Sequence, residues 1–349
     1  METGEGDGRL GKAGRREGPV PRQPLRTLGL LLDSRWGANS RRMNTFVAVN
    51  PASGNGRTGK QWPRIARLLR DAIGPFEAKL TKTPQEATHL VRDAVANGAT
   101  LVIAVGGDGT INEAINGLCN GSDSAPQNVV FGAVTNGTGG DFRRTFEITG
   151  GVAASIERLK NGTVRNIDLG VVTFTRHDGT ESRRWSNNVA SFGFSGEVVR
   201  AVNEARFSKL LGGKIAFLWN SYRELRRYDG FRATLDIDGH VIEDEFCIVA
   251  ICNGRYFGGG MMVAPDADPA DGMFDVVIVR QNPKLSVFDM RLLYSGAHLS
   301  HPNVSVIRAK QLVARSLSNH PVLLDIEGEA PGRLPASFRI VPSALRIRC

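Results

Sequence analysis

The sequence lacks any apolar run that approaches the ~20 residues needed to cross a bilayer as a helix. Cysteine is also scarce. Only four are present, they are scattered, and none has a Cys-x-x-Cys or Cys/His spacing typical of a metal site. We therefore expect reduced, mostly buried thiols, as in a cytoplasmic protein. His298 and His301 lack the helical His-Glu-x-x-His pattern, so we interpret both as structural.

Length and charge narrow the class of protein further. At 349 residues the chain is longer than one core usually supports, so we expect two domains. The formal net charge of +9 suits an acidic ligand or an anionic membrane surface, although solubility alone would also explain it. Residues 1–42, rich in Gly and Arg, are expected to be a disordered extension, and translation could begin at Met43.

The most informative stretch is residues 101–118, LVIAVGGDGTINEAINGL. Leu101–Val105 has the composition of a buried strand, and apolar residues from Ile111 onward recur at helical spacing. A glycine turn between them would direct backbone N–H groups and the positive end of a helix dipole towards one point. This predicts a phosphate cradle with Asp108 placed to hold magnesium or take a proton. A tight turn capped by aspartate is the alternative.

Two more glycine-rich loops follow predicted strands. Residues 50–60, NPASGNGRTGK, nearly match a P-loop, but Gln61 stands where a Ser or Thr would ligate magnesium. They also match the dinucleotide fingerprint, but too far from the preceding strand. Residues 135–144, TNGTGGDFRR, carry two arginines that could offset phosphate charge. We predict that both loops contact phosphate beside Gly106–Thr110; a mobile surface loop is the alternative for the first.

Strands and helices alternate from residue 45 to residue 160, which is typical of a doubly wound, parallel α/β nucleotide-binding domain. Ligands of such sheets bind at the carboxyl ends of the strands, where the three glycine loops and Thr81 emerge. The predicted strands are residues 45–49, 76–80, 101–105 and 129–134, and the predicted helices are residues 64–73, 85–96, 111–118 and 152–160.

Short strands separated by turns dominate from residue 164 onward, which predicts an antiparallel β-sandwich or barrel. The expected domains are residues 43–163 and 164–349, and the last strand could return to the first domain. The predicted strands are residues 165–174, 185–192, 232–237, 241–253, 273–279, 304–309, 321–326 and 337–341. An apolar stripe from Ile215 to Leu225 predicts one helix, for which core packing and a membrane-surface role both stay open.

Two acidic stretches in the second half are candidate sites. Three aspartates within residues 266–271 could ligate a divalent cation or form Asx turns. Asp325, Glu327 and Glu329 alternate, which would place three carboxylates on one side if the strand continues. Crowded carboxylates with at least one partly buried can supply a general base. An exposed acidic strand end is the alternative.

Taken in order, these motifs resemble the bacterial branch of the diacylglycerol kinase catalytic family, which is similar to sphingosine and ceramide kinases. The resemblance covers residues 44–349 and rests on Asn50–Gly54, Gly106–Thr110 with Asn112 and Glu113, Gly137-Thr138 with Asp141-Phe142, Asn253–Gly260, Pro265–Gly272, Gly328-Glu329 and Leu334-Pro335. It implies transfer of the ATP γ-phosphoryl group to a lipid hydroxyl, with Mg²⁺ as a cofactor.

The resemblance also implies a set of site residues. Glu329 matches the family's proposed general base, and Asp108 matches an aspartate used near the catalytic magnesium or as the base. Which of the two takes the proton stays open. Asp268, Asp271 and the carbonyl of Met273 match a magnesium site that braces the second domain. ATP would lie against Asn50, Pro51, Ala52, Ser53, Gly54, Thr81, Gly106, Gly107, Asp108, Gly109, Thr110, Glu113 and Thr138.

The chain departs from the family pattern at two positions. Gly140 stands in place of the usual asparagine before Asp141, and it has no side chain that could contact nucleotide or metal. Glu327 stands in place of the usual aspartate before Gly328, which keeps the charge and lengthens the arm.

The leading expectation is an ATP-dependent kinase of diacylglycerol or a related glycerolipid or sphingoid lipid, cytoplasmic and peripheral to the inner face of the membrane. Its acceptor site would lie between the domains, with an apolar groove in the β-domain. Its partner would be a lipid and not nucleic acid, and a homodimer is possible. A kinase of a soluble acceptor such as NAD shares the Gly-Gly-Asp-Gly-Thr motif. A regulator that binds nucleotide or lipid without turnover is the third alternative.

Overall fold

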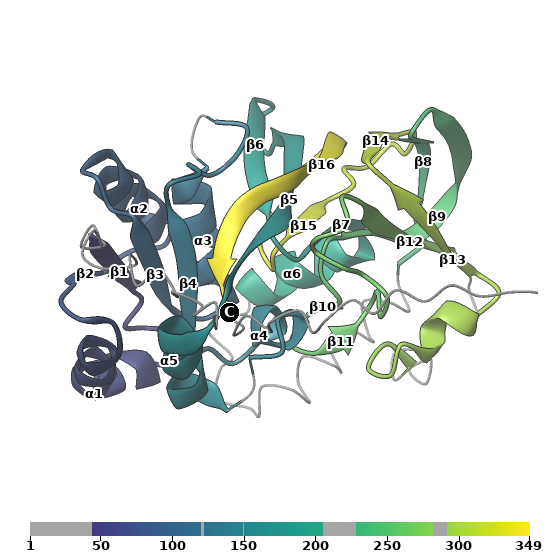
Figure 1. Cartoon of the computed structure of the whole chain (residues 1–349). Coiled ribbons are helices and arrows are strands. Elements are labelled where there is room, and N and C mark those ends of the chain that lie inside the picture. The colour runs from purple at the N-terminus through teal and green to yellow at the C-terminus, as the bar shows by residue number, and fades with distance from the viewer. Residues whose placement is uncertain (1–43, 120–121, 149, 205–227, 282–291) are drawn as a thin grey trace, which may run out of the picture. The chain divides into compact units, whose positions relative to one another are not determined.

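The structure, a computed structural model, describes residues 44–119, 122–148, 150–204, 228–281 and 292–349. The expectations for residues 1–43 and for the helix at residues 215–225 lie outside these ranges. Within them, an α/β half is followed by an antiparallel β half, which confirms the predicted fold class (Figure 1).

Four parallel strands form the sheet of the α/β half, in the spatial order β2-β1-β3-β4. They are β1 (Thr45–Val49), β2 (Glu77–Leu80), β3 (Leu101–Gly106) and β4 (Val130–Thr135). Every residue of β1, β3 and β4 is buried. Strands that are apolar on both faces are typical of a parallel sheet covered by helices on both sides, as predicted.

Alternation along β1 explains how both faces are covered. Val47 and Val49 belong to the apolar cluster under helices α1 and α5, whereas Phe46 and Ala48 belong to the cluster under α2 and α3. These helices are α1 (Arg57–Ile73), α2 (Glu86–Ala96), α3 (Asp108–Leu118) and α5 (Gly151–Asn161). Helix α1 begins seven residues before the predicted start. The predicted start was too late because Gly59 and Pro63, both unfavourable in helices, lie within the helix.

Among its described residues, the β half contains two short strands, β10 (Tyr256–Phe257) and β11 (Met261–Met262), and ten longer ones. The longer ones are β5 (Val164–Arg176), β6 (Glu181–Ser186), β7 (Val189–Gly193), β8 (Phe231–Ile237), β9 (His240–Cys252), β12 (Phe274–Arg280), β13 (Val304–Ala309), β14 (Gln311–Ser316), β15 (Leu324–Ile326) and β16 (Gly332–Arg348). Their inward side chains form one apolar cluster that includes Phe192, Phe246 and Phe338. Strand β14 was not predicted, and the predicted strand 185–192 is divided into β6 and β7 at Asn187-Asn188.

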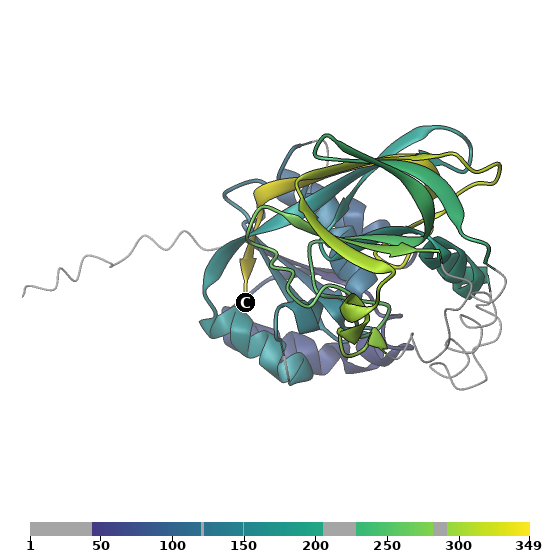
Figure 2. The same cartoon turned by 90° about the vertical axis from the view of Figure 1, so that its right-hand side faces the viewer.

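The last strand connects the two halves. Strand β16 pairs antiparallel with β5 and β14, and near its end Ile347 lies beside Phe131 of β4 in parallel. In both views the C-terminus lies next to the α/β half (Figure 1 and Figure 2). A continuous order of hydrogen-bonded strands therefore runs from β13 to β2 and holds the glycine loops in place against the β half.

Three short helices complete the described residues: α4 (Asp141–Thr145), α6 (Phe194–Glu204) and the 3₁₀ helix η2 (Ala297–Ser300). No helix in the described ranges is long and apolar enough to cross a membrane. All four cysteines are free and three are buried, which confirms the prediction of reduced, mostly buried thiols. His298 is buried with its Nε2 atom 3.0 Å from the carbonyl of Val263, which fits a structural role.

Candidate active site

The glycine loops after β1, β3 and β4 touch one another at the carboxyl edge of the sheet. Asn50 Nδ2 of the first loop donates a hydrogen bond to Thr110 Oγ1 of the second at 3.0 Å. A Cβ atom on Gly137 of the third loop would lie 2.5 Å from the Cα atom of Gly107, so only glycine permits this approach. The predicted convergence of the loops is therefore observed, while ATP binding by them stays a prediction.

The first loop is shaped by its own polar groups. Asn50 Oδ1 accepts a hydrogen bond from the N–H of Ala52 at 3.0 Å, and Ser53 Oγ donates to the carbonyl of Asn50 at 2.9 Å. Gly59 of α1 lies against Pro51, where a Cβ atom would come within 3.1 Å of the proline Cβ. These contacts fix Asn50–Gly54 in one conformation between β1 and α1.

Asp108 positions the third loop. Its Oδ2 accepts a hydrogen bond from the N–H of Gly140 at 2.6 Å, and its Oδ1 accepts one from Phe142 at 3.0 Å. Both donors lie at the start of α4, so Asp108 caps a helix that belongs to the neighbouring loop. Gly140 has a φ of 74°, a left-handed conformation that glycine and asparagine adopt most readily. The backbone of Gly140 thus makes this contact without any side chain.

Asp141 joins the third loop to the β half. Its Oδ2 accepts a hydrogen bond from the N–H of Gly259 at 2.8 Å, and its Oδ1 lies 3.2 Å from Arg144 Nη1. Burial raises the pKa of Asp141, and the charge of Asp108 acts in the same direction. Arg144, predicted to offset phosphate charge, is therefore already paired within the protein.

A basic pocket of about 340 Å³ lies between α1 and α5, beside Gly137. Arg57, Arg64 and Arg143 line it, and none of the described residues that line it is acidic. Its positive charge therefore adjoins the glycine loops.

A second cavity, of about 400 Å³, separates α3 from strand β6 and the turn after β15; we call it the cleft. Its lining includes Gly109 and Glu113 of α3, Arg184 of β6, and Glu327 and Glu329. Few of the described lining residues are apolar, so the cleft is suited to a polar headgroup. The fold thus brings Glu329 close to the glycine loops. Its hydrogen-bond partner, Arg184, lies 145 residues earlier in the sequence.

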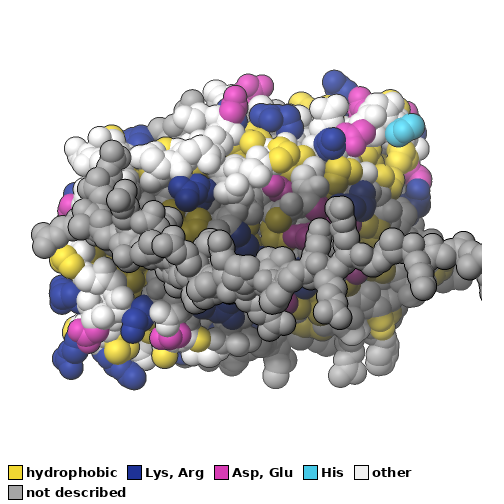
Figure 3. All heavy atoms as spheres, in the orientation of Figure 1, with side chains coloured by type: hydrophobic (Ala, Val, Ile, Leu, Met, Phe, Trp, Pro, Cys, Tyr) yellow, Lys and Arg dark blue, Asp and Glu magenta, His cyan; other side chains and the backbone are white. Residues whose placement is uncertain are grey.

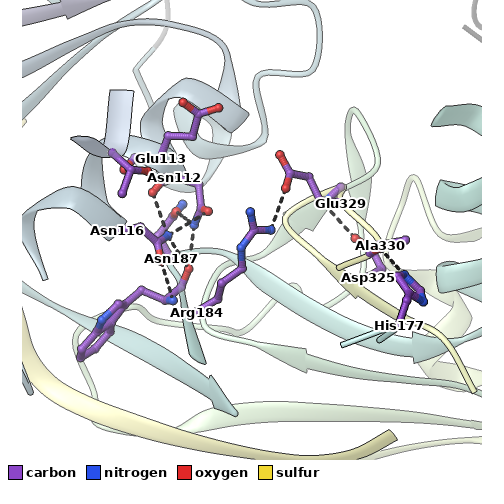
Figure 4. A network of polar contacts seen from close by, with 12 residues as sticks. Asn112, Glu113, Asn116, His177, Arg184, Asn187, Asp325, Glu329 and Ala330 are labelled. Atoms are coloured by element: carbon purple, nitrogen blue, oxygen red, sulfur yellow. Dashed lines mark hydrogen bonds and ion pairs between the residues drawn. The ribbon is translucent and has the colours of Figure 1, made fainter. Parts of the chain in front are cut away.

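Asparagine side chains form hydrogen bonds between α3 and the end of β6 along the cleft (Figure 4). Asn112 Nδ2 donates hydrogen bonds to the carbonyl of Trp185 and to Asn187 Oδ1, both at 2.9 Å. Asn116 Oδ1 accepts one from the N–H of Trp185, also at 2.9 Å. The network links the two walls of the cleft without a covalent connection.

Glu329 and Arg184 point towards each other in the cleft (Figure 4). Arg184 Nη1 donates a hydrogen bond to Glu329 Oε2 at 2.7 Å, and the side chains are 17% and 42% exposed, respectively. The residue predicted as general base is thus partly exposed, with one oxygen bonded to a guanidinium.

The turn after β15 separates the three alternating carboxylates. Ile326 and Glu329 exchange backbone hydrogen bonds of 2.8 and 3.1 Å across Glu327 and Gly328, whose φ values are 56° and 82°. Positive φ at both corners is typical of a type I′ turn. The strand therefore ends at Ile326, and the three carboxylates do not share one side. Asp325 is buried instead and accepts a hydrogen bond from the N–H of Gly328 at 2.8 Å.

Three predicted ATP contacts lie around this edge without contacting one another. Glu113 Oε2 accepts a hydrogen bond from the N–H of Ala87 at 3.2 Å, at the start of α2. Burial raises the pKa of Glu113, and the charge of Glu329 acts in the same direction. Thr81 is buried at the end of β2, whereas Thr138 is exposed beside Gly137.

The predicted magnesium ligands of the β half lie in the loop before β12. Asp268 Oδ1 accepts a hydrogen bond from the N–H of Ala270 at 3.0 Å, which makes an Asx turn. Asp271 Oδ1 accepts one from the N–H of Met273 at 3.0 Å, and its Oδ2 is bonded to the guanidinium of Arg308. The described residues contain no group of three or more His, Cys, Asp or Glu that could hold a metal. Arg308 therefore occupies one oxygen of Asp271, and the magnesium assignment stays a prediction.

Sequence reasoning did not identify Arg184 or the pair Asn187-Asn188, which contribute to the cleft. Both asparagines are buried, and adjacent asparagines in an apolar strand pattern are a signal of a break. Arg184 has no comparable signal, because its partner Glu329 is distant in sequence.

Comparison with known proteins finds a family model that matches each half of the chain. Residues 44–172 match the family model of the diacylglycerol kinase catalytic domain, and residues 188–349 match that of the YegS C-terminal NAD kinase beta sandwich-like domain. The chain is 28% identical over 304 residues to the diacylglycerol kinase of Mycobacterium tuberculosis, which covers 86% of this chain and 93% of the relative.

A Xanthomonas campestris pv. campestris protein named "Probable lipid kinase YegS-like" is 30% identical over 288 residues, or 80% of this chain and 90% of the relative. The crystal structure of a diacylglycerol kinase from Bacillus anthracis shares the fold, with a TM-score of 0.64 at 19% identity over 88% of this chain and 96% of that chain. Together with the motifs of both halves, these matches show that the chain belongs to the diacylglycerol kinase catalytic domain family of lipid kinases.

Proposed function

We propose that this lipid kinase transfers the γ-phosphoryl group of ATP to a hydroxyl of diacylglycerol or a related glycerolipid or sphingoid lipid at a membrane surface. The observation that carries the proposal is the convergence of three glycine loops at one sheet edge, next to a cleft lined by carboxylates. Phosphoryl transfer depends mainly on positioning and on neutralising charge, and this edge supplies groups for both.

The glycine loops are suited to hold the triphosphate. Helix α3 begins at Asp108, and the first N–H groups of a helix have no partner within it, so they can donate to phosphate. Arg57 and Arg143 lie next to these loops and carry positive charge. Mg²⁺ is expected to enter with ATP and to neutralise the phosphate oxygens.

The cleft is suited to hold the acceptor hydroxyl. It borders the start of α3 through Gly109, and its polar lining favours a headgroup over acyl chains. The acyl chains would stay in the bilayer, from which the lipid is drawn. On the face shown in Figure 3, basic and acidic side chains are interspersed among the visible described atoms.

Incubation of the full chain with radiolabelled ATP and mixed micelles that contain diacylglycerol tests the proposal. Label in an organic-phase product supports it. Label in an aqueous product with NAD as acceptor would indicate a kinase of soluble acceptors. ATP binding without either product would indicate a regulator.

A further inference from the structure

Glu327 is anchored through only one of its carboxylate oxygens. Oε1 accepts hydrogen bonds from Ser186 Oγ at 2.7 Å and from the N–H groups of Asn187 and Asn188 at 2.8 and 2.6 Å. None of the hydrogen bonds found among the described residues reaches Oε2. The carboxylate is therefore oriented firmly by the backbone between β6 and β7, with its second oxygen still able to accept a proton.

The same side chain lines the cleft at the end that borders α3. Gly109 and Glu327 line one cavity, and the charge of Asp108 is close enough to act on Glu327. Burial raises the pKa of Glu327 to about 7, the three hydrogen bonds oppose the shift, and Asp108 adds to it. A carboxyl group with a pKa of about 7 can act as an efficient general base near neutral pH.

Glu329 has a different environment, although it lies only two residues away. Its Oε2 is bonded to Arg184, and its side chain is 42% exposed. Its charge is thus balanced by a fixed guanidinium, whereas no cation is bonded to Glu327 among the described residues. The ion pair between Glu329 and Arg184 is suited to holding the wall of the cleft in position.

We infer that Glu327, rather than Glu329, accepts the proton of the acceptor hydroxyl. This inference rests on the proposed function. The hydroxyl oxygen forms a bond to the γ-phosphorus, and its proton passes to Glu327 Oε2. The bond from the γ-phosphorus to the bridging oxygen breaks, and ADP leaves with that electron pair. Glu329 and Arg184 act as positioning residues.

The longer side chain at this position fits the inference. Glu327 occupies a left-handed turn position, from which its side chain reaches the N–H groups of Asn187 and Asn188. An aspartate would be one methylene shorter, so it could not keep the same bonds and the same placement of the second oxygen. The substitution of Glu for the usual Asp is therefore part of the proposed function and not a neutral exchange of acids.

The pH dependence follows from the groups that face Glu327. These are Asp108 from α3, Glu113 across the cleft, and Glu329 paired with Arg184. Arg176 and Arg183 also line the cleft and add positive charge. A general base must be deprotonated, so kcat/KM should fall as the pH drops below about 7.

The test compares wild type with Glu327→Gln, Glu327→Asp and Glu329→Gln in the micelle assay, from about pH 5.5 to about pH 9. Glu327→Gln keeps an acceptor for the three donors, so we expect a Tm at least as high as that of wild type, an unchanged KM for ATP and a kcat lowered by about 100-fold or more, without the break near pH 7. Glu327→Asp should recover part of kcat together with a pH break. Glu329→Gln should lower kcat by no more than about 10-fold and keep the break.

An active wild type with a full pH break in Glu327→Gln would overturn the inference and leave the proposed function intact. Loss of kcat confined to Glu329→Gln would do the same. Wild type that labels no lipid at any pH would overturn both.

Discussion

The two walls of the cleft are built from different groups. The wall of the α/β half presents the backbone of Gly109 at the start of α3 beside polar side chains such as Glu113, whereas the wall of the β half presents charged side chains such as Arg184, Glu327 and Glu329. Backbone N–H groups bind phosphate by position and dipole, which suits any nucleotide. In the proposed function, the side chains of the second wall select the acceptor and move its proton. We therefore expect changes in the first wall to act on ATP and changes in the second to act on kcat.

Among changes to the first wall, the largest effect is expected from Asp108→Asn, because this side chain holds the third glycine loop in place. Its two oxygens hold the N–H groups of Gly140 and Phe142, and an asparagine offers only one acceptor. The third loop should move, with a loss of about 100-fold in kcat/KM for ATP and of about 1–3 kcal/mol in the free energy of unfolding. Asp123→Asn is the control, since that side chain is 81% exposed. If Asp108→Asn had the same kinetics as wild type, the role given to the first wall in ATP use would be contradicted.

Gly109→Ala tests whether the backbone wall binds ATP through close approach. A Cβ atom there would meet no protein atom within 4 Å, and Gly109 faces the cleft from the first turn of α3. The variant should therefore fold at least as stably as wild type, since alanine favours helix. Its KM for ATP should rise by about 10-fold, because the methyl group would keep phosphate away from the N–H groups. A normal KM would show that phosphate does not approach here.

Asp325, two residues before Glu327, is buried and lowers the free energy of unfolding at high pH. Burial raises its pKa to about 7 from the ordinary 3.8, so the folded state keeps a proton that the unfolded state releases between these pH values. Its contribution to stability is complete below about 3.8 and is lost as the pH rises through 7. Asp325→Asn should recover part of the free energy of unfolding that is lost at high pH, on the order of a few kcal/mol. The raised pKa of Glu327 adds to the same pH-dependent loss. Urea unfolding at about pH 5 and about pH 8 measures it. Identical pH dependence in both proteins would refute the assignment.

The smallest effect is expected from loss of the ion pair between Arg308 and Asp271, which lies outside the cleft. The side chains are 53% and 28% exposed, so Arg308→Gln should lower the free energy of unfolding by less than about 1 kcal/mol. Wild type should unfold at the same temperature with EDTA or with Mg²⁺, because the guanidinium already supplies the charge. A clear Tm increase with Mg²⁺ in wild type would instead favour a metal-braced loop.

The backbone wall could be predicted from sequence because its signals are local. A strand, a glycine turn and a helix follow one another within residues 101–118, and parallel pairing then brings the loops to one edge. Even there, the cap that Asp108 places on α4 went unpredicted, since it joins residues more than thirty positions apart.

The side-chain wall could be predicted only in part. The turn at Glu327 requires positive φ in a residue that seldom adopts it, so the alternating carboxylates suggested a continuing strand. The ion pairs Arg184–Glu329 and Arg308–Asp271 each join a strand to a turn or loop that is distant in sequence, so no local pattern predicts them. In strand β14 the outward Val313 stands between the buried Leu312 and Ala314, so three consecutive apolar residues hide the alternation and the strand was not predicted.

Amide hydrogen exchange of the full chain, with and without Mg²⁺-ATP, tests the division between the walls most directly. We predict that ATP slows exchange in the glycine loops at residues 50–56, 106–110 and 136–140, and leaves residues 184–188 and 326–329 unchanged. Protection confined to the β-half segments, with the glycine loops unaffected, would contradict the account.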